Sequence, residues 1–118
     1  MSDLTNRDFA SWSEQQAKRR LKKRVRTIAE HLIRLQASPA AHSKAAWQRT
    51  VVEQRDELET ILDDSPSLRP IVAAVIAAEL PVARQLAALA LEEYRETLST
   101  AIDQIDYTEE QVLGPWLP

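Results

Sequence analysis

The stretch KRRLKKRVRTIAEHLIRLQ, residues 18–36, decides the fold of this chain. Its apolar residues recur in a four-three spacing, which places them on one side of a helix. They are Leu21, Val25, Ile28, Leu32 and Leu35. Upstream, Phe9, Trp12 and Gln16 keep the same spacing. We therefore predict a long amphipathic helix over about residues 8–36, either as one helix or as two pieces joined near Lys18.

Both ends of this helix carry signals. Thr5, followed by Asp8 three positions later, resembles a capping box that would start it. Ser38 and Pro39 predict its end, because proline disfavours helical backbone in the residue before it. A second helix is expected to begin within residues 40–43, antiparallel to the first because the turn is short. Its apolar stripe is Trp47, Val51, Leu58, Ile61 and Leu62.

The third segment, residues 68–91, is the most apolar part of the chain. Residues 63–67 form a clear break before it, and Ser65 or Ser67 could cap the helix that follows. Apolar residues occupy more than one side of this segment, so we predict that it is the buried central helix. Pro81 lies in its middle and predicts a kink. The helix is expected to continue to about residue 100.

The C-terminal part of the sequence contains several closely spaced signals for helix starts and ends. Residues 102–106 are expected to form a crossing loop, and Thr108 with Gln111 forms a second capping box. Gly114 and Pro115 predict a stop. The result is a short helix over residues 109–113, followed by an apolar anchor at Trp116 and Leu117.

Composition limits the fold classes. The chain has 118 residues, 44% of them hydrophobic and 28% charged, which fits one globular domain over residues 1–118. Gly114 is its only glycine, which argues against tight hairpins and phosphate-cradling loops in the body of the chain. The fold class predicted is all-α, a small helical bundle with long amphipathic helices and a short C-terminal helix.

Compartment and covalent chemistry are also constrained. The chain has no cysteine, which excludes disulfides, thiolate nucleophiles and cysteine-ligated metals. No apolar run is seen that approaches the roughly 20 residues of a membrane span, and the polar N-terminus lacks the apolar core of a secretory signal. We therefore expect a cytoplasmic protein with no membrane segment.

Several ordered landmarks carry a family resemblance. They are Asp8-Phe9 with Trp12 and residues 14–17; His31-Leu32 with Gln36, Pro39 and Trp47; residues 64–68; and Tyr107-Thr108 with residues 111–113 and Leu117-Pro118. In this order the chain resembles a bacterial family, numerous in cyanobacteria, known as domain of unknown function twenty-nine. The resemblance implies an all-helical fold. It implies no known activity, cofactor or catalytic residue.

Charge is distributed unevenly along the chain. Residues 1–52 hold eleven basic and four acidic side chains, a balance of +7, whereas residues 53–118 have a balance of −10. Seven of the nine residues from 18 to 26 are basic. They are Lys18, Arg19, Arg20, Lys22, Lys23, Arg24 and Arg26. On a helix these side chains would surround the Leu21 and Val25 stripe on its solvent side.

Two interpretations of this basic stretch stay open. Such a density of cations can neutralise phosphates and bind nucleic acid in a salt-dependent way, although no helix-turn-helix or glycine-bearing recognition turn accompanies it. Alternatively, the cations pair with the acidic second helix, within one protomer or across a dimer. That helix carries Glu53, Asp56, Glu57, Glu59, Asp63 and Asp64.

Catalytic and metal chemistry have few candidates. His31 lies near the apolar stripe and could serve a ligand or acid–base chemistry, although a half-buried structural histidine is the simpler interpretation. His42 is expected in a solvated turn, and no spacing puts two metal ligands on one helical face. Trp12 and Trp47 are expected in the core. No cofactor is predicted.

Together these features favour a protein-interaction or assembly module without catalytic activity, which completes its core as a homodimer or against another protein. The alternatives are a nucleic-acid-binding accessory protein that uses the basic residues 18–26, and an enzyme or small-ligand binder around His31.

Overall fold

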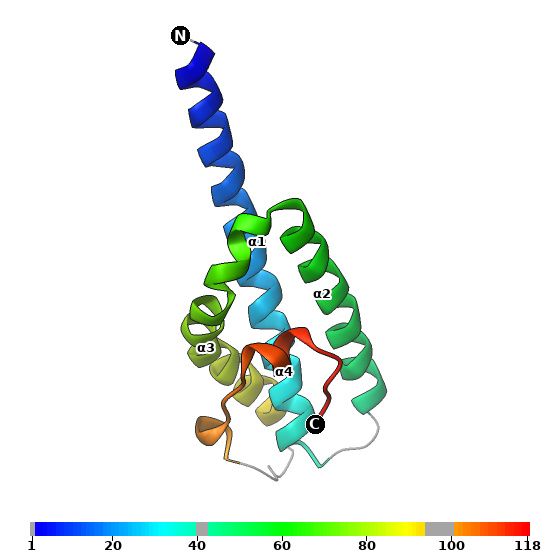
Figure 1. Cartoon of the computed structure of the whole chain (residues 1–118). Coiled ribbons are helices and arrows are strands. Elements are labelled where there is room, and N and C mark those ends of the chain that lie inside the picture. Colours follow the sequence, from blue (N-terminus) through cyan, green and yellow to red (C-terminus); the bar gives the residue numbers. More distant parts are fainter. Residues whose placement is uncertain (1, 40–42, 94–100) are drawn as a thin grey trace.

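The computed structural model describes residues 2–39, 43–93 and 101–118, and the side chains of residues 12–39, 43–92 and 101–118. Within these residues the chain contains helices and no strand (Figure 1). The elements are α1 (Ser2–Ala37), α2 (Lys44–Asp64), the 3₁₀ helix η1 (Pro66–Ile71), α3 (Val72–Glu93), the 3₁₀ helix η2 (Ile102–Gln104) and α4 (Glu109–Leu113). The predicted all-α class and small bundle are confirmed.

The centre of the bundle is α1. It packs against both α2 and α3, whereas α2 and α3 scarcely contact each other within the described residues. The four-three stripe explains this position: Leu21, Val25, Ile28 and Leu32 are fully buried and Leu35 is nearly so. The prediction that the third segment is the central helix is wrong. Its high apolar content is shared between the core and an exposed face.

The first helix is longer than its sequence signals indicated. It is one continuous helix that begins at Ser2, so Thr5 and Asp8 lie inside it rather than at its start. Its N-terminal part extends beyond the other helices (Figure 1), and the molecule measures 60 Å along its longest axis and 22 Å across. Among the described side chains of α1, the first buried one is that of Ala17.

The breaks between helices agree well with the sequence. Ser38 and Pro39 follow the end of α1, and α2 begins at Lys44. Ser65 occupies the position before η1, but its side chain makes no capping hydrogen bond. Helix α3 continues through Pro81 to Glu93. The kink at Pro81 stays a prediction, and the expected extension to residue 100 lies outside the described residues.

The C-terminal segment folds back over the bundle (Figure 1). The Thr108–Gln111 capping box is confirmed, with the Gln111 N–H donating to Thr108 Oγ1 at 3.2 Å and the Thr108 N–H donating to Gln111 Oε1 at 2.9 Å. Helix α4 ends at Gly114, where a Cβ would lie 2.6 Å from the Glu110 carbonyl oxygen. This close approach requires glycine.

Polar contacts fix this segment in place. The Tyr107 hydroxyl donates to Gln36 Oε1 at 3.0 Å, and the Tyr107 ring lies 5.8 Å from that of Trp116. Burial raises the pKa of Tyr107 well above its usual value, so the hydroxyl stays a donor. Trp116 and Leu117 pack against the core as partly buried residues, which confirms the predicted apolar anchor.

Candidate functional site

The basic stretch lies on α1 where that helix enters the bundle. Two of its seven cations are paired with the neighbouring helices. Arg24 Nη2 lies 2.7 Å from Glu57 Oε2 of α2, and Arg26 Nε lies 2.9 Å from Glu79 Oε1 of α3. The two pairs therefore join α1 to α2 and to α3.

Five cations remain exposed: Lys18, Arg19, Arg20, Lys22 and Lys23. In the part of the chain whose side chains are described, none of them has a carboxylate within salt-bridge distance. Together with Arg26, four of them line a shallow hollow of about 430 Å³. They are Arg19, Arg20, Lys22 and Lys23. The surface can therefore accept several phosphate or carboxylate groups at once.

Within one protomer, the predicted pairing of this stretch with the acidic second helix is found for Arg24 among the described side chains, and pairing across a dimer stays a prediction. Three other acidic residues of α2 have different partners: Glu53 pairs with Arg49 on its own helix, and Glu59 and Asp63 pair with Arg69 of η1. The reason is helical geometry. Only the cation on the α2 flank of α1 can reach across, because its neighbours point about 100° further round for each residue.

Trp12 is exposed, and its predicted core position is wrong. Trp12 is 58% exposed, and it precedes Ala17, the first buried residue among the described side chains of α1. The spacing between Trp12 and Leu21 in the sequence would have predicted this exposure. Nine residues turn a helix by about two and a half turns, which puts Trp12 on the side opposite Leu21. Trp47, in contrast, is 6% exposed, as predicted.

His31 is half-buried on the bundle-enclosed part of α1. Its Nδ1 donates to the Thr27 carbonyl oxygen at 2.9 Å. Burial is the largest influence on the ring and lowers its pKa, with smaller contributions from the Thr27 hydrogen bond and from the charges of Arg34 and Glu30. The geometry is that of a structural histidine. His42 lies outside the described residues.

A pH dependence of stability follows for His31. Because burial lowers its pKa in the folded state below the ordinary value of 6.5, the unfolded chain binds this proton more readily. The free energy of unfolding should therefore fall as the pH drops below about 6.5, and this contribution should be constant at higher pH. The His31→Gln variant should lose this part of the pH profile. Urea denaturation between pH 5 and pH 8 measures it, and an unchanged difference between the two proteins across that range would contradict it.

The exposed side of α3 is apolar. Val82 and Leu86 are each 37% exposed and Leu89 is 64% exposed. Gln85 is the only polar residue among the exposed positions between residues 73 and 89. The others are Ala73, Ala74, Ala77, Ala78, Pro81, Val82, Leu86, Ala88 and Leu89. We call this surface the α3 face. It is the largest departure from the polar outside expected of a bundle helix.

Length and composition alone would let the segment Pro66–Glu92 cross a membrane, which corrects the expectation that no segment qualifies. The core helix of a bundle passes the same test, and 33% of the most apolar window is buried here. Glu79 and Arg84 interrupt the apolar run in the sequence. In the fold their charged groups are engaged, by Arg26 and by the Ile105 carbonyl oxygen.

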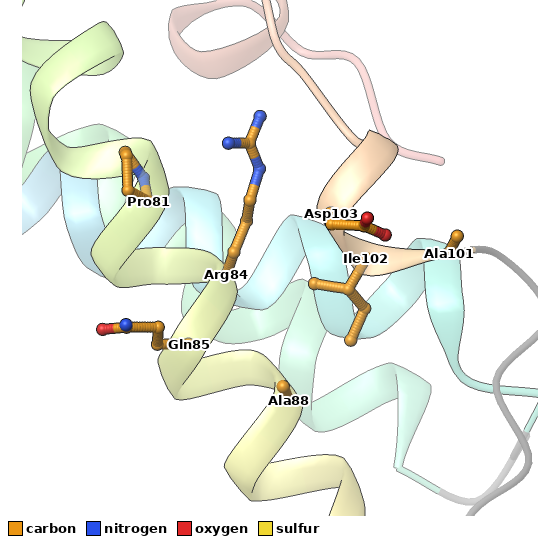
Figure 2. A pocket seen from close by; sticks show the side chains of 7 residues that line it. All are labelled: Pro81, Arg84, Gln85, Ala88, Ala101, Ile102 and Asp103. Atoms are coloured by element: carbon orange, nitrogen blue, oxygen red, sulfur yellow. The ribbon is translucent and has the colours of Figure 1, made fainter.

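A second hollow of about 590 Å³ lies between α3 and η2 (Figure 2). Ile102 points toward α3, and the Arg84 guanidinium extends away from the helix (Figure 2), where it donates to the Ile105 carbonyl oxygen at 2.9 and 2.6 Å. Asp103 is the one carboxylate among the described residues that line this hollow. With its cation already engaged and a single acid, this hollow suits an apolar side chain better than acid–base chemistry.

Metal ligands do not gather in the described part of the chain, where no group of three or more His, Cys, Asp or Glu side chains could hold an ion. Ser67, one of the two predicted caps, instead lies 3.4 Å from Glu14 Oε1 through its hydroxyl. Sequence reasoning missed Arg55 altogether. Its guanidinium donates to the carbonyl oxygens of Val112, Gln111 and Trp116 at 2.9, 2.7 and 2.6 Å.

Comparisons with known proteins agree with the landmarks in the sequence. Neither a search of curated proteins nor a search of solved structures gave a match. The model of the family described as Domain of unknown function DUF29 matches residues 11–117. This match covers every helix except the projecting first turns of α1. The chain therefore belongs to the Domain of unknown function DUF29 family.

Proposed function

We propose that the protein is an assembly module that works through protein–protein contact, and that it forms a homodimer through the α3 face. One observation carries this proposal. The exposed side of α3 presents alanine, valine, leucine and proline from residue 73 to residue 89 with Gln85 as its one polar interruption. Helices that face water on one side normally carry charged or polar residues there.

Covering this face would be favourable for a simple reason. Apolar surface removed from water contributes roughly 25 cal/mol per Å², and Leu89 alone leaves 64% of its surface in contact with solvent. The alanines at positions 74, 77 and 78 would let a second helix approach closely, because their side chains end at Cβ. The larger side chains of Val82, Leu86 and Leu89 would then fill the space beside them.

A second copy of the chain suits this face better than a charged partner does. In a two-fold dimer the same patch meets itself, so a charged patch would place like charges opposite each other. The basic face of α1 and the acidic face of α2 are therefore poor self-pairing surfaces. The α3 face carries no charge between residues 73 and 89 apart from the inward-facing Glu79 and Arg84, so it can pair with itself without repulsion.

The proposal predicts a strong effect of one charge on the α3 face. Leu89→Glu should raise the dimer dissociation constant about a hundredfold or more, because each interface would then contain two unpaired carboxylates. Sedimentation velocity from 1 to 100 µM measures the change. Val52→Glu is the matched control, since Val52 is 58% exposed on α2 and lies outside the α3 face.

The outcomes separate clearly. A wild-type dimer, a monomeric Leu89→Glu variant and a dimeric Val52→Glu variant would support the proposal. A wild-type protein that stays monomeric at 100 µM would contradict it, and so would a dimer that both glutamates leave intact. Circular dichroism of each variant checks that helix content is unchanged.

A further inference from the structure

We infer that the exposed side of α1, which carries Trp12, Arg19 and Lys23, is a binding surface for single-stranded nucleic acid. Trp12 stacks on a base, and the neighbouring cations hold phosphates. This inference is independent of the proposed dimer, because it uses a different helix. It joins two features that the sequence analysis treated separately: the cation cluster of residues 18–26, and a tryptophan that was expected in the core.

The two features share one side of the same straight helix. Arg19, Lys23 and Arg26 follow Trp12 by seven, eleven and fourteen residues. These spacings return a helix to nearly the same direction each time. The resulting strip runs for roughly 21 Å along α1, at about 1.5 Å per residue. The aromatic ring and the cations are therefore spaced along the helix axis rather than around it.

Five cations of the basic stretch are available to a ligand. Lys18, Arg19, Arg20, Lys22 and Lys23 are exposed and have no carboxylate partner within the described side chains. A hollow of about 430 Å³ can hold the backbone of a ligand. It is lined by Arg19, Arg20, Lys22, Lys23 and Arg26. Glu79 lies 2.9 Å from Arg26, and this ion pair fixes the orientation of the Arg26 side chain in the hollow.

A tryptophan beside such a cluster favours nucleic acid over an acidic protein. A cluster of cations alone attracts any polyanion. An exposed aromatic ring adds a stacking surface that every base can use and that acidic side chains cannot. With 58% of its surface exposed, Trp12 offers a broad face to solvent.

Single strands fit this surface better than duplexes. Leu21 and Val25 are fully buried against the bundle, so only one side of the basic stretch is open to a ligand. Bases already stacked inside a duplex are also closed to Trp12, whereas those of a single strand are open. The acidic second half of the chain, with a balance of −10, would repel the strand from other surfaces and orient it onto α1.

The test uses the full chain and a fluorescein-labelled twenty-nucleotide oligothymidine, with fluorescence anisotropy as the readout. We expect the binding constant to fall with salt concentration with a log–log slope of about 3 to 4 for five phosphate contacts. Arg19→Gln combined with Lys23→Gln should reduce that slope by about 1.4. Arg49→Gln, which removes an exposed cation of α2, is the matched control and should bind like the wild type.

Trp12 is tested separately. Trp12→Ala should weaken binding about tenfold or more, and Trp12→Phe should restore most of the loss because a phenyl ring still stacks. Wild-type affinity in Trp12→Ala would overturn the inference, and so would equally strong competition by polyglutamate, a polyanion without bases. Equal affinity for a twenty-base-pair duplex would also overturn it. Circular dichroism of each variant checks that helix content is unchanged.

Discussion

Leu32→Ala is expected to lower the free energy of unfolding by about 3–5 kcal/mol. Leu32 is fully buried on α1, the helix that packs against both α2 and α3. Removing its side-chain branch leaves a cavity that the surrounding helices cannot fill without losing contacts elsewhere. Alanine favours helix at least as well as leucine, so the loss is one of packing and not of helix propensity.

Guanidinium denaturation at one fixed protein concentration measures this effect, because dimerisation would make stability depend on concentration. Val52→Ala is the control. Val52 is 58% exposed on α2, and its truncation should change stability by less than about 0.5 kcal/mol. An equally small loss for Leu32→Ala would mean that α1 is not the centre of the core.

Arg55→Ala is expected to lower the free energy of unfolding by about 2–4 kcal/mol. The Arg55 guanidinium donates to three backbone carbonyl oxygens of the C-terminal segment, those of Gln111, Val112 and Trp116. Hydrogen bonds from charged donors each contribute about 1.5–3 kcal/mol. We expect a total below the sum of three, since the guanidinium is partly exposed and water can replace some of these contacts.

The Arg55→Lys variant separates the effect of the positive charge from that of the hydrogen-bond geometry. Arg55→Lys keeps the positive charge but can reach one carbonyl at a time, so it should recover only a minor part of the loss. Near-ultraviolet circular dichroism should also change in Arg55→Ala, because Trp116 and Tyr107 lie 5.8 Å apart in the segment that Arg55 holds. Arg49→Ala, on the exposed side of the same helix, should leave both signals unchanged. Full stability in Arg55→Ala would show that apolar packing alone holds the segment.

The helix boundaries that sequence could predict are those with local chemical signals. Pro39 ends α1, and the Thr108–Gln111 capping box starts α4, because a ring or a side chain acts on backbone groups only a few residues away. The start of α1 was mispredicted because Thr5 and Asp8 imitate such a signal within a helix that continues to Ser2.

The features that sequence could not predict depend on long-range partners. Arg55 and Arg84 bind carbonyl oxygens 21 to 61 residues away, and backbone acceptors leave no mark on the sequence. The same holds for α3. Its apolar residues led to the wrong prediction that it is the central helix, because the sequence does not show which side of it α1 covers.

The sequence predicted which residues form the basic surface, but not which of them form ion pairs with neighbouring helices. The sequence identified all seven cations and left open whether they pair with the acidic helix. In the structure Arg24 and Arg26 pair with carboxylates, and the other five cations do not within the described side chains. Distances between helices, rather than the numbers of opposite charges, decide which pairs form.

The most direct test of the proposed assembly is a cysteine cross-linking scan of the α3 face. The chain has no cysteine of its own, so Ala74→Cys, Ala78→Cys, Gln85→Cys and Leu89→Cys each introduce a single thiol. A disulfide needs Cβ atoms about 3.5–4.5 Å apart, so across a two-fold axis only the positions nearest the axis can pair. We predict rapid covalent dimer formation at one position or at two neighbouring positions of this face, and none at Val52→Cys. Equal rates at Val52→Cys and on the α3 face, or no cross-linking at any of the four positions, would contradict the account.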